Sequence, residues 1–144
     1  MILHNFDEVC MKISTKGRYA VRIMAELARH PNDYVSVAEL SEKQDISAKY
    51  IEKIISLLVK AKLIESTRGA QGGYMLTKQH EQYTIAEILR TTDDLPKLVP
   101  CLDGSTQCPR MEFCDSITCW DKLTKLITDY LSNITLADLL NKKI

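Results

Sequence analysis

Four cysteines stand close together in the C-terminal half of this 144-residue chain, namely Cys101, Cys108, Cys114 and Cys119. The first ten residues lack the basic and apolar regions of an export signal, so we expect a cytoplasmic protein whose thiols stay reduced. Clustered thiols in that setting bind metal ions or react with oxidants. The spacing therefore predicts a metal or redox site.

Three kinds of site suit these thiols. The gaps of six, five and four residues contain no Cys-x2-Cys knuckle, which structural zinc sites prefer, so an iron–sulfur cluster is favoured over zinc. A cluster-free site that senses thiol oxidation or a partner protein is the third alternative. The visible absorbance of protein kept from air separates them, because only a cluster absorbs there.

A long loop holds most of this cysteine cluster. Residues 93–116 include Pro96, Pro100, Gly104 and Pro109 and show no hydrophobic periodicity, which is typical of a functional loop. On one helix Cys114 and Cys119 would point about 140° apart. Cys119 can therefore join the site only if Cys114 precedes the next helix, and it is otherwise a buried residue of that helix.

Apolar residues at spacings of three and four follow this loop, and they are Trp120, Leu123, Ile127, Tyr130 and Ile134. The pattern predicts a long helix over residues 117–134 that pairs with its symmetry mate in a homodimer. Packing within one monomer is the alternative. Thr135 is placed to cap a final short helix that ends near Leu140.

The charges of the chain are divided unevenly, although they sum to zero. Residues 11–80 hold twelve Lys or Arg against seven Asp or Glu, and the remainder holds the reverse. A positive excess in the N-terminal half suits an anionic partner such as nucleic acid.

Helical signals recur through this positive half. Residues 16–30 have apolar positions at helical spacing. Ser36 and Glu39 form a capping-box pattern that begins a short helix ending near Gln44. After a break, Ser47 is placed to cap a second helix, whose buried stripe is Ile51, Ile54, Ile55, Leu58 and Ala61. Two short helices joined by a tight turn predict a helix-turn-helix.

The other face of the second helix carries side chains suited to duplex DNA. We expect Lys49, Tyr50 and Lys53 to contact phosphates, and Glu52 and Ser56 to reach base edges in the major groove. A hairpin with a glycine-rich tip follows as a wing that can approach the sugar-phosphate backbone, through Arg68, Gly69, Gln71, Gly72 and Gly73. Thr84 and Glu87 then repeat the capping-box pattern for a helix over residues 85–92.

These elements predict a mainly α-helical winged helix-turn-helix with a β-hairpin wing and a long C-terminal dimerisation helix. We expect a tail at residues 1–10, a DNA-binding domain at 11–80, and a cysteine loop with dimerisation helices at 81–144. No apolar run approaches the length of a membrane span. Nucleotide-binding and catalytic motifs are missing, so neither an enzyme nor a small-molecule substrate is expected.

Four strings in this order resemble the Rrf family of bacterial transcription regulators, which includes the IscR-like and NsrR-like iron–sulfur regulators. They are residues 11–20, the Gly72-Gly73-Tyr74 wing, the cysteine loop and residues 133–139. The resemblance implies a dimeric winged-helix regulator of a DNA operator, expected to be a repressor. It also implies a [2Fe-2S] or [4Fe-4S] cluster on Cys101, Cys108 and Cys114.

The resemblance does not supply a fourth ligand. The IscR-like pattern has a histidine three residues after the third cysteine, where this chain has Ile117. The NsrR-like pattern has an acidic residue near the N-terminus, where this chain has Arg18. Cys119 is therefore the substitute to consider, since thiolates are the usual cluster ligands. A histidine or a residue of the partner subunit is the remaining alternative.

Overall fold

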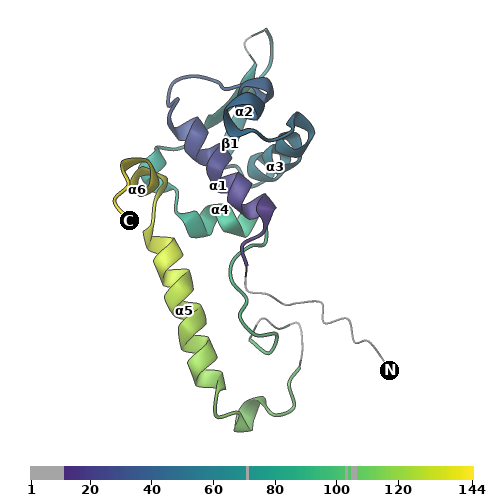
Figure 1. The fold of residues 1–144 in the computed structure, drawn as a ribbon, viewed down its shortest axis with the longest axis vertical. Helices are drawn as coiled ribbons and strands as arrows, with labels where there is room; N and C mark the ends of the chain where they lie inside the picture. The colour runs from purple at the N-terminus through teal and green to yellow at the C-terminus, as the bar shows by residue number, and fades with distance from the viewer. Residues whose placement is uncertain (1–11, 71, 103, 105–106) are drawn as a thin grey trace.

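The computed structural model describes residues 12–70, 72–102, 104 and 107–144. The predicted tail at residues 1–10 and the wing residue Gln71 lie outside the described residues. A globular body holds the N-terminal helices and the hairpin, and one long helix extends away from it (Figure 1). Within the described part of the chain, no helix has both the length and the apolar character needed to span a bilayer.

Three helices form the first half of the body. They are α1 (Thr15–Ala28), α2 (Val37–Gln44) and α3 (Ala48–Lys60). Each begins where a serine hydroxyl accepts a backbone N–H: Ser14 from Gly17, Ser36 from Glu39 and Ser47 from Tyr50. The predicted helix-turn-helix is confirmed in α2 and α3.

Two antiparallel strands form the wing, β1 (Ile64–Thr67) and β2 (Gly73–Leu76), with Ile64 opposite Leu76. Val35 bridges to Tyr74 through two backbone hydrogen bonds of 3.0 and 2.9 Å. This bridge attaches strand β2 of the wing to the segment before α2, so the wing and the helix-turn-helix form one body.

The second half of the chain returns to the body after a long excursion. Its elements are the 3-10 turn η1 (His80–Gln82), α4 (Ile85–Thr91), the 3-10 turn η2 (Met111–Phe113), α5 (Ile117–Asn133) and α6 (Leu136–Asn141). The backbone of Thr84, before α4, bridges to Thr135, before α6. Residues on both sides of the cysteine loop are therefore anchored together.

Two of the predicted capping boxes are only half formed. Ser36 and Thr84 accept the backbone N–H of Glu39 and Glu87, as expected. The carboxylates of these glutamates instead form ion pairs, Glu39 with Lys43 at 3.6 Å and Glu87 with Lys78 at 3.0 Å. A complete capping box does form at Thr135 and Asp138. There the carboxylate of aspartate, whose side chain is shorter than that of glutamate, accepts the backbone N–H of Thr135 at 2.9 Å.

The hydrophobic core lies where α1, α3 and α4 pack against one another. The predicted stripe of α3 is buried at Ile51, Ile54, Ile55 and Leu58, whereas Ala61 is exposed beyond the end of the helix. Leu136 of α6 is fully buried and belongs to the same core. Helix α6 therefore packs against the DNA-binding body, and the expected division at residue 80 stays a prediction.

Candidate nucleic-acid interface and cysteine loop

Helix α3 presents a polar face to solvent. Lys49, Glu52, Lys53 and Ser56 are all exposed, as the sequence predicted. The hydroxyl of Ser56 donates to the backbone oxygen of Lys53 at 3.0 Å, so its oxygen is left to accept from another group. The face combines two cations with one carboxylate, which is a set that can contact phosphates and read a base edge.

Tyr50 occupies a different position from these four residues. It is half-buried, and its ring lies 5.8 Å from that of Tyr19 at an interplanar angle of 86°. This edge-to-face contact joins the start of α3 to α1. Tyr50 therefore helps to position α3 against α1, and it lies beside the polar face of α3.

The wing uses its glycines for two separate purposes. Gly69 has a φ of +116°, and its place for a Cβ is open, so it turns the tip beside the exposed Arg68. A Cβ on Gly73 would meet the Val35 backbone oxygen at 2.6 Å. Gly72 and Gly73 do not have positive φ, so Gly69 supplies the positive φ of the tip and Gly73 is needed for close backbone approach.

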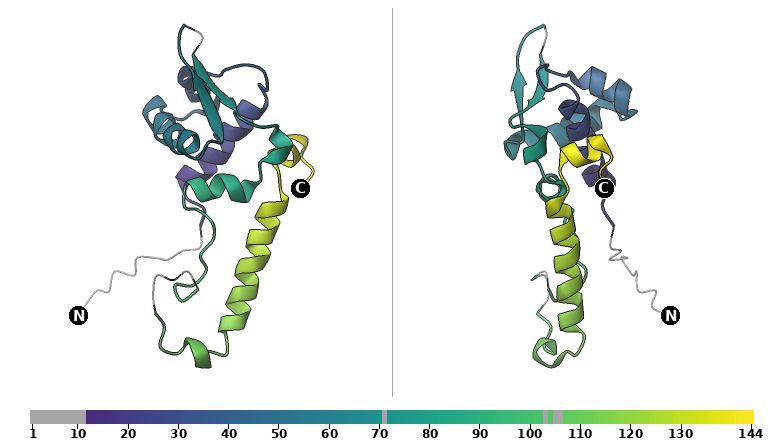
Figure 2. Two further views of the ribbon diagram at one scale, coloured as in Figure 1. Left: turned by 180° about the vertical axis from the view of Figure 1, so that it is seen from behind. Right: turned by 90° about the vertical axis from the view of Figure 1, so that its left-hand side faces the viewer.

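The cysteine loop and α5 form an arm that leaves the body at α4 and returns to it at α6. The far end of this arm, at η2, and the tip of the wing lie at opposite ends of the molecule in both views of Figure 2. Any signal that begins at the far thiols must therefore pass through α5, through the start of the loop, or through a second subunit.

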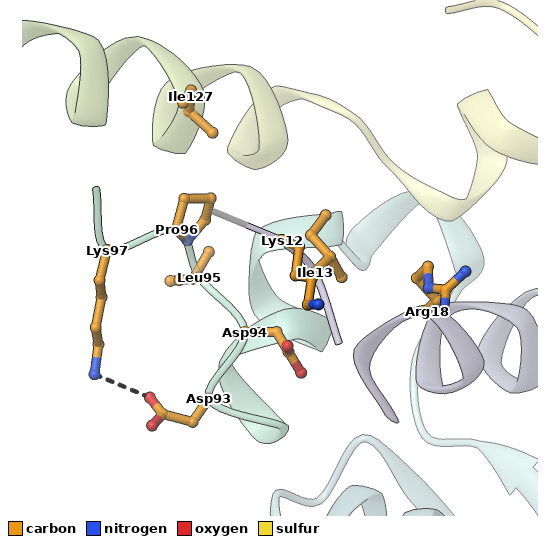
Figure 3. Close-up of a pocket in the computed structure, with 9 residues that line it drawn as sticks. All are labelled: Lys12, Ile13, Arg18, Asp93, Asp94, Leu95, Pro96, Lys97 and Ile127. Carbon is orange, nitrogen blue, oxygen red and sulfur yellow. Dashed lines mark ion pairs between the residues drawn. The ribbon is translucent and has the colours of Figure 1, made fainter. Parts of the chain in front are cut away.

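A cavity of about 510 Å³ lies where the arm meets the body. Its lining combines the start of α1, the segment after α4 and Ile127 of α5, as the close-up shows (Figure 3). Within it, Lys97 and Asp93 form an ion pair of 3.4 Å. The first residues of the loop thus face both the DNA-binding body and the long helix.

The four clustered cysteines are present as free thiols. Cys101, Cys108 and Cys114 are half-buried and Cys119 is exposed. Cys114 precedes α5, and Cys119 lies in its first turn, which is the arrangement that would let both thiols face one site. Hydrogen bonds from Ser116, whose hydroxyl lies 3.4 Å from the thiol, are the main cause that lowers the pKa of Cys114 below its usual value.

These thiols fit an iron–sulfur cluster by the chemistry of the donors, since thiolates are its usual ligands. They are not gathered around one point. Among the described residues, no group of three or more His, Cys, Asp or Glu side chains is arranged to hold a metal ion. The expected ligands therefore have the chemistry that a cluster needs, but their side chains are not arranged around one point in this structure.

Helix α5, which is described along its whole length, has no fully buried residue. Leu126 and Tyr130 are 66% and 59% exposed, and Trp120 and Leu123 are also exposed. Of the predicted seam, Ile127 and Ile134 are partly buried instead. Leu126 was missed by the sequence interpretation, although it lies three residues after Leu123 and four before Tyr130, so the exposed apolar face is wider than predicted.

The helix-turn-helix, its β-hairpin and the polar face of α3 define a winged helix-turn-helix regulator. A family model described as "Rrf2: Iron-dependent Transcriptional regulator" matches residues 13–142. The chain therefore belongs to the Rrf2 family.

Named relatives agree with this membership. The chain is 36% identical over 131 residues to "Protein rrf2" of Nitratidesulfovibrio vulgaris, covering 90% of this chain and 87% of that protein. It is 37% identical over 134 residues to the HTH-type transcriptional regulator IscR of Pectobacterium atrosepticum, covering 92% and 81%. The expectation of a transcription regulator rather than an enzyme is confirmed by these similarities.

Solved structures of two regulators superpose on this fold. One, described as "T. potens IscR", matches with a TM-score of 0.73 at 36% identity and covers 92% of this chain and 88% of its own. The other is CymR, "the Global Cysteine Regulator of B. subtilis", with a TM-score of 0.75 at 30% identity, covering 91% and 97%. The predicted winged-helix fold is thereby confirmed.

Proposed function

We propose that this chain is a dimeric DNA-binding repressor whose affinity for its operator is controlled by the thiols of the 93–116 loop. The observation that carries the proposal is the joining of an exposed, cation-bearing α3 to a cysteine-bearing arm in one fold. Similarity to IscR supports control by an iron–sulfur cluster on Cys101, Cys108 and Cys114.

The proposed DNA interface is the polar face of α3 together with the wing. Lys49, Lys53 and Arg68 would contact phosphates, with Tyr50 and the wing backbone of Gly69, Gln71, Gly72 and Gly73 beside them. Glu52 and Ser56 would face base edges, where a carboxylate favours the amino group of cytosine. A dimer of such modules would bind an inverted repeat.

Two substitutions test this interface on a duplex enriched by the unaltered protein from a random library. Lys53→Ala should weaken binding to all duplexes and lower the slope of log Kd against log salt by about one. Glu52→Ala should change the enriched sequence while leaving that slope in place. If Lys53→Ala leaves the salt slope unchanged and Glu52→Ala leaves the enriched sequence unchanged, the proposed DNA interface is excluded.

The proposed dimer uses the exposed apolar face of α5. Trp120, Leu123, Leu126 and Tyr130 are exposed on this arm, and a second copy supplies a matching face by symmetry. Leu126→Lys should convert the dimer to a monomer in sedimentation experiments. Thr118→Lys, at another exposed position of the same helix, is the matched control and should leave the dimer intact. Dimers formed equally by both variants would exclude this face.

The proposed cluster would be held by Cys101, Cys108 and Cys114, with Cys119 as the candidate fourth ligand. The cluster would supply redox-sensitive thiolate ligation, and the chain would supply a loop that becomes ordered when several residues share one ligand. Protein purified without air should absorb broadly in the visible, and Cys108→Ala should abolish that absorbance. Equal operator affinity with and without the cluster would exclude control by it.

A second candidate is control by thiol oxidation without a cluster. The observations that favour it are the exposed position of Cys119 and the match of the fold to CymR. This candidate predicts colourless protein without bound iron whose operator affinity changes on treatment with a thiol oxidant. A colourless protein with stoichiometric zinc would instead identify the third alternative.

A further inference from the structure

We propose that Arg22 of α1 is a positioning residue that sets the orientation of α3 on DNA by holding the end of α2. The proposal rests on the DNA interface given above. It concerns a side chain that lies outside that interface and that the sequence interpretation did not single out. Tyr19 and Glu26 complete the arrangement.

Tyr19, Arg22 and Glu26 follow one another at spacings of three and four, so they form a stripe on one face of α1. Each member contacts the helix-turn-helix. Tyr19 contacts Tyr50 of α3, and both Arg22 and Glu26 contact Gln44 of α2. This stripe therefore bridges both helices on either side of the turn.

Arg22 binds the last residue of α2 in two ways. Its Nε donates to Gln44 Oε1 at 3.1 Å, and its Nη2 donates to the backbone oxygen of Gln44. That oxygen is one of the carbonyls that a helix leaves unpaired at its C-terminus, where a cation is also favoured by the helix dipole. The next residue, Asp45, turns the chain with a φ of +53°.

Glu26 holds the same glutamine from the other side. Gln44 Nε2 donates to Glu26 Oε2 at 3.1 Å, so both ends of this amide are occupied. Glu26 is only 6% exposed and is fixed by Arg29 at 2.8 Å and by Lys43 at 3.3 Å. The amide of Gln44 therefore has one orientation, and it presents its oxygen to Arg22.

Arg22 also reaches the start of α3 through Tyr19. The guanidinium carbon lies 5.1 Å from the centre of the Tyr19 ring, a cation–π distance. Tyr19 in turn contacts Tyr50 edge-to-face, three residues into the proposed recognition helix. One side chain thus touches the end of α2 directly and the beginning of α3 through a single neighbour.

The turn between these two contacts spans only residues 45–47. Its geometry decides how Glu52 and Lys53 approach the duplex, because both stand on the helix that the turn orients. Lysine cannot replace Arg22, since one ammonium cannot donate to two oxygens in the geometry of a planar guanidinium while also lying over a ring.

The test compares Arg22→Ala, Arg22→Lys and Lys53→Ala on the duplex enriched by the unaltered protein. Arg18→Ala is the matched control, because Arg18 is another exposed arginine of α1 and its guanidinium donates to the hydroxyl of Thr15 within the same helix. We expect both Arg22 variants to lose about tenfold in affinity, as for a charge-assisted hydrogen bond, with an unchanged salt slope. Arg18→Ala should retain full affinity.

Amide hydrogen exchange gives the local readout. In Arg22→Ala the amides of residues 44–50 should exchange faster, while those of α4 and the wing keep their protection. Gln44→Ala is the second variant: it removes the side-chain half of the Arg22 contact and keeps the backbone oxygen, so its loss in affinity should be smaller than that of Arg22→Ala and should not fully add to it. Additive losses would overturn the proposal.

Three further outcomes distinguish the positioning role from a direct phosphate contact and from failure of the proposed DNA interface. A salt slope reduced by about one in Arg22→Ala and restored in Arg22→Lys would show that Arg22 contacts a phosphate. Unchanged affinity in both Arg22 variants, with weakened binding in Lys53→Ala, would overturn the positioning role alone. Unchanged affinity and salt slope in Lys53→Ala would show instead that the proposed interface has failed.

Discussion

The backbone N–H and the hydroxyl of Ser14 both donate to the carboxylate of Asp94, at 2.7 and 2.8 Å, across 80 positions of sequence. Ser14 caps α1, and Asp94 lies just after α4 at the start of the cysteine loop. This pair therefore joins the beginning of the DNA-binding body directly to the beginning of the arm, and it lines the cavity of Figure 3 at Asp94.

Removal of this carboxylate should weaken the fold in a pH-dependent way. Burial by itself would raise the pKa of Asp94, but hydrogen bonds from Thr92 and Ser14 outweigh it and lower the pKa. A carboxyl whose pKa is lowered by folding stabilises the protein above its unfolded pKa and loses that effect as the pH falls through the folded value. Asp94→Ala should cost about 2 kcal/mol near neutral pH.

Urea unfolding at a series of pH values measures this effect. The difference between the unaltered protein and Asp94→Ala should begin to narrow as the pH falls below about 4, the unfolded pKa, and should keep narrowing until the pH lies below the folded pKa, where the carboxyl is protonated in both states. Asp93→Asn, at the exposed neighbouring residue whose φ of +57° asparagine also tolerates, is the control and should change stability little. A difference that stays constant down to the acid limit would contradict the assignment.

Gly17→Ala should destabilise the protein although Gly17 is inside a helix. Alanine in place of a helical glycine normally gains about 1 kcal/mol. Here the added Cβ would lie 2.5 Å from Oδ2 and 2.7 Å from Cγ of Asp94, so we expect a net loss of about 1–2 kcal/mol from overpacking. Thermal unfolding of the Gly17→Ala protein shows whether its stability is lower or higher than that of the unaltered protein.

The double variant separates this clash from a general effect at Gly17. With Asp94→Ala present, the nearest remaining atom is the residue 94 Cβ at 3.0 Å. The penalty of Gly17→Ala should then mostly disappear, and the two effects should not add. Strictly additive losses would exclude a clash between these residues.

The buried hydroxyl of Tyr83 should contribute measurably to the attachment of the wing. It donates to the backbone oxygen of Leu63 at 2.8 Å and accepts the N–H of Lys78 at 2.9 Å. Tyr83→Phe leaves the Lys78 N–H without this acceptor at the base of the hairpin, so about 1–3 kcal/mol should be lost. Tyr34→Phe is the control, because that hydroxyl is exposed and bonded to Glu65 at 3.3 Å. Equal unfolding midpoints for the two variants would contradict this role.

Cys114 should react as a thiolate at lower pH than an ordinary cysteine thiol in protein without a metal. Hydrogen bonds from Ser116 lower the pKa of Cys114, and the thiolate is the reactive form. Alkylation by iodoacetamide at a series of pH values, followed by peptide mass analysis, gives the midpoint for each cysteine. Ser116→Ala should move the midpoint of Cys114 upward. A midpoint of Cys114 that the substitution does not move would exclude the hydrogen bond as its cause.

Caps and hydrophobic periods allowed most elements to be predicted before any tertiary contact was known. Ser36, Ser47 and Thr135 each begin a helix at the residue expected, because capping needs only a hydroxyl and a backbone N–H three residues away. The exposed position of Lys53 and the loop position of Cys114 follow from the same local signals. The sequence thus determined the class of fold and the candidate residues of the DNA interface.

Contacts between distant segments were decided only by the tertiary structure. The Asp94–Ser14 pair, the approach of Gly73 to Val35 and the hold of Arg22 on Gln44 all depend on how packed elements meet, and no sequence period reports that. The exposure of Leu126 has the same origin, since α5 extends away from the body (Figure 1). Local hydrogen bonds such as helix caps depend on residues that are close in sequence, whereas burial and long-range pairing depend on how the whole chain packs.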